Sequence, residues 1–324
     1  MTSATWAEYL AQSIFHALVA SLVVEALVRA WRVVEPRQRM GLRLLGVALP
    51  LFVSPALMVL FPVRATEAFR RAAALFEARR WDDLRWLGMG LMGWWVLAMA
   101  GAGLALLLVD LVPYLRRRSG PRRAETPLAA ARAAALEGLV RPLSAGLALA
   151  PPRIVHLGSD LPLLYCTGLR RPALVVSRGA LALLDPGELR AAVAHELCHL
   201  AHRDPVSSWA LFLARGLLAF NPAFQVVARV LMRDAESLAD ERAAELTGDR
   251  LALASAVLRL YRAGAGVTGA RTLPFAAALA RVRAADVELR CRRLLEPAPA
   301  PLPFGFARVV LGGLAVTGLL FFVV

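Results

Sequence analysis

Four long apolar stretches set the strongest limit on how this chain of 324 residues can fold. They run over residues 9–31, 42–63, 87–115 and 304–324, and each is long enough to cross a bilayer as a helix, which takes about 20 residues. Hydrophobic residues make up 58% of the chain and charged residues only 19%, a balance that disfavours an ordinary soluble protein. The sequence therefore predicts a bundle of four transmembrane helices.

The placement of arginine predicts how these spans are oriented. The net charge of +14 comes from arginine alone, and most arginines flank apolar stretches, which favours membrane topology over nucleic-acid binding. Arginines are dense at 29–43 and again at 116–123, whereas the N-terminal tail has none. We therefore expect the N-terminus outside and region 116–303 in the cytoplasm, in a multi-pass protein of the inner (plasma) membrane. The connection 64–86 does not fit this orientation, because its arginines would lie on the outer side of the membrane.

Three parts of the chain follow from this reading. Residues 1–115 hold three spans, residues 116–303 form a separate cytoplasmic domain, and residues 304–324 form the fourth span. Within the first part, the outer connection 64–86 carries Phe69 and Phe76 at helical spacing and then tryptophans. This pattern predicts an amphipathic helix on the membrane surface, with a ligand-sensing loop as the alternative.

Region 116–303 combines helices with a few short strands. Apolar runs at 153–157, 163–167 and 173–177, separated by turn residues, predict a small antiparallel sheet between helical segments. The fold class is therefore α+β, a membrane helix bundle joined to a mainly helical domain. The three cysteines, Cys166, Cys198 and Cys291, are scattered and odd in number, so they form no disulfide framework.

The most informative motif lies on a helix predicted for residues 185–203. Asp185-Pro186-Gly-Glu188 has the residues of a capped helix start. Within that helix, the HExxH motif puts His195 and His199 four residues apart and therefore on one face, where two imidazoles can hold one metal ion. Glu196 lies between them, positioned to act as general base on a metal-bound water. Burying three such polar groups on an apolar helix without a metal would be costly.

A catalytic zinc site needs a third protein ligand. The best candidate is Glu236, on a helix predicted from about Asn221 to Gly248. Asp240 lies one turn further on the same face, where it can accept a hydrogen bond from a ligand histidine and fix its tautomer. Other acidic residues lie nearby, so spacing alone leaves a solvated acidic face as the alternative.

These residues also carry a family resemblance. HELCHLAHRDP, from His195 to Pro205, together with ESLAD, from Glu236 to Asp240, resembles the gluzincin metallopeptidases of membranes. The layout of three spans, a cytoplasmic zinc domain and a fourth span is similar to the BlaR/MecR-type antirepressor peptidases, as are residues 169–176, 185–189 and 287–297. The resemblance implies a zincin-like domain with His195, His199 and Glu236 as Zn²⁺ ligands, Glu196 as catalytic base and Asp240 behind the ligands.

The resemblance also implies an activity. It indicates a zinc endopeptidase that cleaves a cytoplasmic or membrane-proximal protein in signal transduction, for example a helix-turn-helix repressor, with no direct contact to nucleic acid. The chain ends at Val324 without the penicillin-binding sensor of the best-known members, so antibiotic sensing is not implied. A housekeeping protease of the HtpX or prenyl-protease type is the alternative enzyme. A non-hydrolytic zinc-binding receptor is the alternative of another class, and the intact Glu196 argues against it.

Secondary expectations concern the surroundings of the metal. His202 is expected to be an exposed residue rather than a fourth ligand, and Cys166 a buried thiol rather than a regulatory zinc ligand. We expect the substrate to lie extended along an edge strand near 172–177. The substrate itself, its cleavage site, the activating signal and the oligomeric state are not predicted by the sequence.

Overall fold

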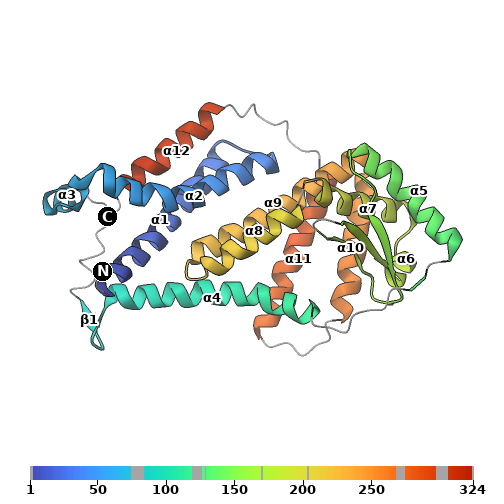
Figure 1. Cartoon of the computed structure of the whole chain (residues 1–324), viewed down its shortest axis with the longest axis horizontal. Helices are drawn as coiled ribbons and strands as arrows, with labels where there is room; N and C mark the ends of the chain where they lie inside the picture. Colours follow the sequence, from blue (N-terminus) through green and yellow to red (C-terminus); the bar gives the residue numbers. More distant parts are fainter. Residues whose placement is uncertain are drawn as a thin grey trace. The chain divides into compact units, whose positions relative to one another are not determined.

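The computed structural model describes residues 3–73, 84–118, 126–127, 129–168, 171–202, 204–267, 274–296 and 306–322. The described chain is mostly helical, with two small sheets (Figure 1). It divides into two compact units. The first holds residues 1–119, 211–235 and 300–324, and the second holds residues 120–210 and 236–299. Residues 211–235 fall within the predicted cytoplasmic domain but cluster with the apolar N-terminal helices.

The first unit is built from long apolar helices. They are α1 (Ser3–Ala30), α2 (Pro36–Leu60), α3 (Glu67–Ala73), α4 (Leu91–Arg118) and α12 (Phe306–Phe321), with the second half of α8 (Asp204–Leu217) and the first half of α9 (Pro222–Thr247). A short 3-10 helix at Pro62–Ala65 and the hairpin β1 (Arg85–Trp86) and β2 (Met89–Gly90) connect them. Only the first part of the predicted amphipathic connection 64–86 is seen as α3, because residues 74–83 lie outside the described ones.

Two helices of the described chain, rather than four, meet the length and hydropathy of a membrane span. They are Leu10–Ala30 in α1 and Leu91–Val112 in α4. The predicted fourth span is a helix of only 16 residues, α12, whose rise of about 24 Å is less than the roughly 30 Å of hydrocarbon. In α2 the side chains of residues 51, 53–55 and 58 lie outside those described. The prediction of four spans is therefore not met.

Ion pairs join the helices of the first unit. Asp234 on α9 pairs with Arg43 and, at 3.2 Å, with Arg39, both on α2. Arg43 also pairs with Glu25 on α1 at 3.0 Å. Because Asp234 and Arg43 are largely buried, these contacts fix α9 against the N-terminal helices.

The second unit combines a three-stranded sheet with helices. Its elements are α5 (Ala130–Gly146), β3 (Arg153–Leu157), β4 (Leu164–Thr167), β5 (Ala173–Ser177), α6 (Arg178–Leu183), α7 (Pro186–Ala201), the second half of α9, α10 (Arg250–Val267) and α11 (Pro274–Leu295). Their apolar faces share one core that includes Leu174, Val193, Leu197 and Leu253. This core surrounds α7, the helix that carries the HExxH motif.

The sheet differs from the predicted antiparallel one. Its order is β3-β5-β4, and β3 pairs with β5 in parallel while β4 pairs with β5 antiparallel. The last strand, whose five residues are all buried, therefore lies between the other two. Consequently, the prediction that 172–177 is a free edge is wrong, since β5 is paired on both sides. The edges are β3 and β4.

Candidate metallopeptidase site

The helix α7 begins and is anchored as its sequence predicts. Asp185 accepts a hydrogen bond from the Glu188 amide, and Glu188 accepts one from the Asp185 amide, so the capping box is complete. The Glu188 carboxylate also accepts hydrogen bonds from Ser255 and Arg259 on α10. These contacts fix the start and rotation of α7, and they thereby fix the direction in which its histidines point.

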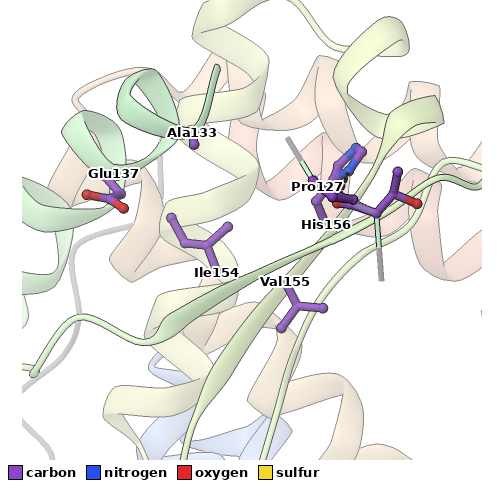
Figure 2. A pocket seen from close by; sticks show the side chains of 7 residues that line it. Pro127, Ala133, Glu137, Ile154, Val155 and His156 are labelled. Carbon is purple, nitrogen blue, oxygen red and sulfur yellow. Dashed lines mark hydrogen bonds between the residues drawn. The ribbon is translucent and has the colours of Figure 1, made fainter. Parts of the chain in front are cut away.

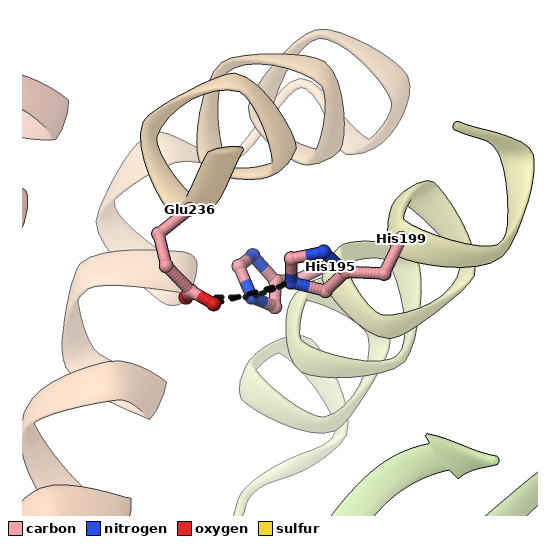
Figure 3. Close-up of side chains that lie close together, drawn as sticks. All are labelled: His195, His199 and Glu236. Atoms are coloured by element: carbon pink, nitrogen blue, oxygen red, sulfur yellow. Dashed lines mark hydrogen bonds and ion pairs between the residues drawn. The ribbon is translucent and has the colours of Figure 1, made fainter. Parts of the chain in front are cut away.

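His195 and His199 project from one face of α7 toward Glu236 on α9 (Figure 3). Their Nε2 atoms are 3.1 Å apart, and each lies 3.6 Å from one carboxylate oxygen of Glu236. Four ligands at about 2.0–2.1 Å around a tetrahedral ion are separated by roughly 3.3 Å. Two imidazole nitrogens and a carboxylate oxygen at these separations therefore fit a single metal ion, and this donor set suits a catalytic zinc.

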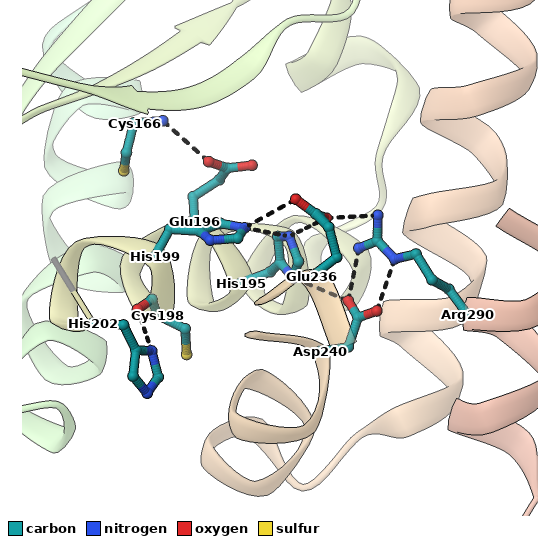
Figure 4. Close-up of polar contacts among 9 residues, drawn as sticks. All are labelled: Cys166, His195, Glu196, Cys198, His199, His202, Glu236, Asp240 and Arg290. Carbon is teal, nitrogen blue, oxygen red and sulfur yellow. Dashed lines mark hydrogen bonds and ion pairs between the residues drawn. The ribbon is translucent and has the colours of Figure 1, made fainter. Parts of the chain in front are cut away.

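Asp240 and Arg290 support this cluster from behind (Figure 4). Asp240 Oδ1 lies 3.0 Å from His195 Nδ1, and Arg290 on α11 donates to both Asp240 oxygens at 2.7 Å. Arg290 also pairs with Glu236 at 2.8 Å. Because Asp240 contacts Nδ1 of His195, the other ring nitrogen, Nε2, faces His199 and Glu236, where a metal ion would be held.

Arg290 was not predicted as a site residue. Its place in the site depends on packing between α11 and α9, across fifty residues of sequence. The only available signal was its position in the 287–297 stretch that resembles the peptidase family.

Contacts between charged groups shift the pKa values of His195, Glu236 and Asp240. Burial alone would lower the pKa of His195, but contacts with Asp240 and Glu236 raise it to about 10. Burial works against ionisation of Glu236 as well, but His195 and Arg290 lower its pKa to about 2. The pKa of Asp240 is likewise lowered by His195 and Arg290 in spite of burial. In the absence of a metal, His195 is therefore protonated at neutral pH, and its proton occupies part of the space that a cation would take.

Glu196 lies on the other side of the histidines, against the sheet. Its Oε2 accepts a hydrogen bond from the backbone N–H of Cys166 on β4 at 3.0 Å, which holds the carboxylate between the edge strand and the cluster (Figure 4). Burial raises the pKa of Glu196 although both histidines oppose the shift. A carboxylate with a raised pKa is suited to take up and return a proton.

His202 and Cys166 lie outside the metal cluster that the described residues form. His202 follows the last turn of α7, where its Nδ1 is 2.8 Å from the carbonyl oxygen of Cys198. Burial, together with the nearby Glu196, raises the pKa of the Cys166 thiol, so it is a poor metal ligand as it stands. Cys198 is fully buried in the core.

A separate hollow lies elsewhere in the second unit. It has a volume of about 390 Å³ and is bordered by α5 and β3 (Figure 2). Its lining includes Glu137, Ile154 and His156, none of which belongs to the cluster. His156 Nδ1 contacts the Thr126 carbonyl there at 3.1 Å, so this segment covers part of the outer edge of β3.

The sequence of this chain is similar to those of known proteases. Residues 151–272 match the family model described as BlaR1 peptidase M56. The chain is 30% identical over 208 residues to a protease HtpX homolog of Acidiphilium cryptum, which covers 52% of this chain and 72% of that protein. The chain belongs to the family of membrane metallopeptidases that includes these HtpX homologs.

Further relatives agree with this assignment. Protease HtpX homologs of Paenarthrobacter aurescens and Pseudarthrobacter chlorophenolicus are 34% and 35% identical over 165 and 169 residues. These matches cover 41% and 43% of this chain and 57% of each relative. The chain thus spans little more than half the length of these two proteins. The expected metallopeptidase family is confirmed, whereas the BlaR/MecR type within it stays a prediction.

Proposed function

We propose that this protein is a zinc-dependent endopeptidase of the plasma membrane. The observation that carries the proposal is the cluster of His195, His199 and Glu236 with Glu196 beside it. His195, His199 and Glu236 would hold the ion, and Asp240 with Arg290 would orient two of these ligands. A zinc ion bound there would supply a Lewis acid that polarises a scissile carbonyl and lowers the pKa of water.

Glu196 then performs the proton transfers of hydrolysis. Because Oε2 accepts the Cys166 amide, Oε1 is the oxygen that takes a proton from the attacking water. The water oxygen bonds to the carbonyl carbon, the carbon–nitrogen bond breaks, and Glu196 gives its proton to the leaving amine. The raised pKa of Glu196 favours this uptake and release.

We propose that the substrate binds along β4 rather than β5. Ser177 donates its amide hydrogen to the Leu163 carbonyl, so the backbone groups of Leu163 face β5. Successive residues of a strand direct their N–H and C=O groups to opposite sides, so those of Leu164 and Cys166 face away from β5. The Cys166 amide, which contacts Glu196, agrees with this alternation. An extended peptide added to this edge would pass directly beside the proposed base.

The two enzyme alternatives, a signalling peptidase and a housekeeping protease, differ in the class of protein that they would cleave. The BlaR1 match favours a regulatory, repressor-like protein, while the HtpX homologs favour a housekeeping protease acting on membrane-proximal proteins. The HtpX matches reach over more of the chain, which gives the housekeeping reading somewhat more support. Comparing the membrane and cytoplasmic proteomes of cells with the wild type and with Glu196→Gln separates them. One accumulating regulator favours signalling, and many damaged membrane proteins favour housekeeping.

The Glu196→Gln variant also tests hydrolysis itself. Purified protein in lipid vesicles is incubated with fluorescently labelled casein, and the zinc content is measured in the same preparation. Removing the base is expected to reduce cleavage by about 10²–10⁴-fold while zinc stays bound. Glu245→Gln is the matched control, because Glu245 lies exposed on α9, where it pairs with Arg242 at the surface. Equal cleavage by Glu196→Gln and wild type would exclude this mechanism, and absence of cleavage in both would favour the non-hydrolytic receptor.

A further inference from the structure

The hairpin of α8 and α9 exposes apolar side chains and buries polar ones. Between residues 210 and 232 every exposed residue is non-polar, namely Ala210, Phe212, Leu213, Gly216, Leu217, Val226 and Met232. Leu217, beside the turn, is 80% exposed, and Leu213 is 60% exposed. The first exposed charged residue after them is Arg233. A surface in water normally shows the opposite distribution.

The polar side chains of the hairpin are turned inward and satisfied there. Arg215, Asn221 and Gln225 are at most 5% exposed. Arg215 donates to Gln225 at 2.9 Å and to Asp110 of α4 at 2.5 Å, and Arg229 donates to the same Asp110 oxygen at 2.9 Å. Asp110 is the only charged residue in the candidate span Leu91–Val112, and its carboxylate pairs with both arginines within these helices.

The turn of the hairpin also satisfies its own backbone. The Gln225 amide group donates to the carbonyl oxygens of Arg215 and Leu218, which lie at the end of α8. The Asn221 side chain accepts a hydrogen bond from the Phe224 amide at the start of α9. Water would supply such partners to an exposed turn at no cost, whereas hydrocarbon supplies none.

The depth of the turn follows from its contact with α4. A Cβ atom added at Gly103 would lie 2.3 Å from the Ala219 carbonyl oxygen, so the turn touches the α4 backbone at this position. Gly103 is the thirteenth residue of the 22-residue span Leu91–Val112. At about 1.5 Å of rise per residue it lies roughly 18 Å from Leu91 and roughly 14 Å from Val112, near the middle of the span.

We propose that α8 and the first half of α9 form a re-entrant hairpin immersed in the bilayer beside α4, with its outer face in contact with phospholipid acyl chains. At 14 residues α8 is too short to cross the hydrocarbon, so the chain enters and leaves on the side of Val112. The continuous apolar face on α4, which includes Leu97, Leu104 and Leu108, extends the same lipid-facing surface. The helix that presents Glu236 is thereby anchored in the membrane at its first half.

Site-directed labelling in vesicles tests this placement. Single cysteines replace Leu217 or Leu251 in a chain whose native cysteines are changed to alanine, with zinc content and circular dichroism measured as checks on folding. Leu251 is the matched control, because it is 69% exposed but lies beside the exposed Asp249 and Arg250. Labelling by a membrane-impermeant maleimide should be about tenfold or more slower at Leu217→Cys, because thiolates form poorly in apolar surroundings.

A second arm identifies what covers the hairpin. A bimane fluorophore at Leu217→Cys should be quenched by phosphatidylcholine carrying a nitroxide near the end of its acyl chain, and less by a headgroup nitroxide. Gly103→Val should reduce this quenching, while Gly101→Val should not, because a Cβ at Gly101 meets nothing within 4 Å. Labelling of Leu217→Cys at the rate of Leu251→Cys would overturn the proposal. Slow labelling without quenching by acyl-chain nitroxides would also overturn it, in favour of a second copy of the chain. None of these readouts depends on hydrolysis.

Discussion

Replacing Asp240 by asparagine probes how the site holds its metal. Asp240 contacts His195 on one side and receives two hydrogen bonds from Arg290 on the other. An asparagine of the same shape has only one acceptor oxygen, so its amide group must face either the His195 N–H or an N–H of Arg290. One of these contacts is therefore lost whichever way the side chain turns.

The expected magnitude follows from these contacts. Losing one charge-assisted hydrogen bond in this largely buried pair should lower the free energy of unfolding of the metal-free protein by about 1.5–3 kcal/mol. Arg290 keeps Glu236 as a partner at 2.8 Å, which keeps the loss below that of an unpaired buried charge. Because His195 is less firmly oriented, the zinc dissociation constant should rise by about 10–100-fold.

Two measurements check this prediction. Competition with a chromophoric chelator gives the zinc affinity, and denaturant unfolding of the metal-free protein gives the stability. Glu245→Gln on the same helix, which breaks only an exposed pair with Arg242, should leave both within experimental error. Zinc affinity in Asp240→Asn equal to that of wild type would show that Asp240 does not orient a ligand.

Three further predictions follow from the geometry. Since His195 has a pKa of about 10 without metal, its proton must leave when zinc binds, and zinc affinity should rise about tenfold per pH unit as pH rises toward that value. Calorimetry in buffers of different ionisation enthalpy should find close to one proton released from His195 when zinc binds. A zinc affinity that does not change with pH would contradict this prediction. Leu164→Pro removes an outward N–H of β4 and should therefore raise the KM for casein while zinc stays bound, whereas Leu164→Ala keeps this N–H and should leave the KM unchanged. Equal KM values for Leu164→Pro and wild type would rule out substrate binding at this edge. Arg290→Met should weaken zinc binding as well, as measured by chelator competition, since Glu236 loses its partner.

Local signals in the sequence were sufficient for the elements that carry the site. The capping residues Asp185 and Glu188 mark the start of α7, and the four-residue spacing of His195 and His199 places them on one face. The helix from 222 to 247 matches the expected one, and it brings Glu236 and Asp240 to these histidines. For α7 the information lies within one or two helical turns, whereas the choice of Glu236 among the nearby acidic residues also needed the family resemblance of residues 236–240.

Features that depend on long-range packing were not predicted. The order of the sheet was missed, because three short apolar strands can pair in several ways and only the packed core selects β5 as the centre. Arg290 was missed, since its partners lie on another helix. The hairpin was read as ordinary helices, because which face of α8 is exposed becomes visible only when Arg215 and Gln225 are seen turned inward.

The central claim is that one zinc ion at His195, His199 and Glu236 enables Glu196 to drive peptide hydrolysis. The most direct measurement is the zinc content of the purified chain by mass spectrometry, with casein cleavage followed in the same vesicles before and after chelation and zinc replacement. We expect about one zinc per chain, cleavage that is lost and regained with the metal, and a Glu196→Gln protein that holds zinc without cleaving. Undiminished cleavage by the stripped chain, or a wild type that binds no zinc, would contradict the account.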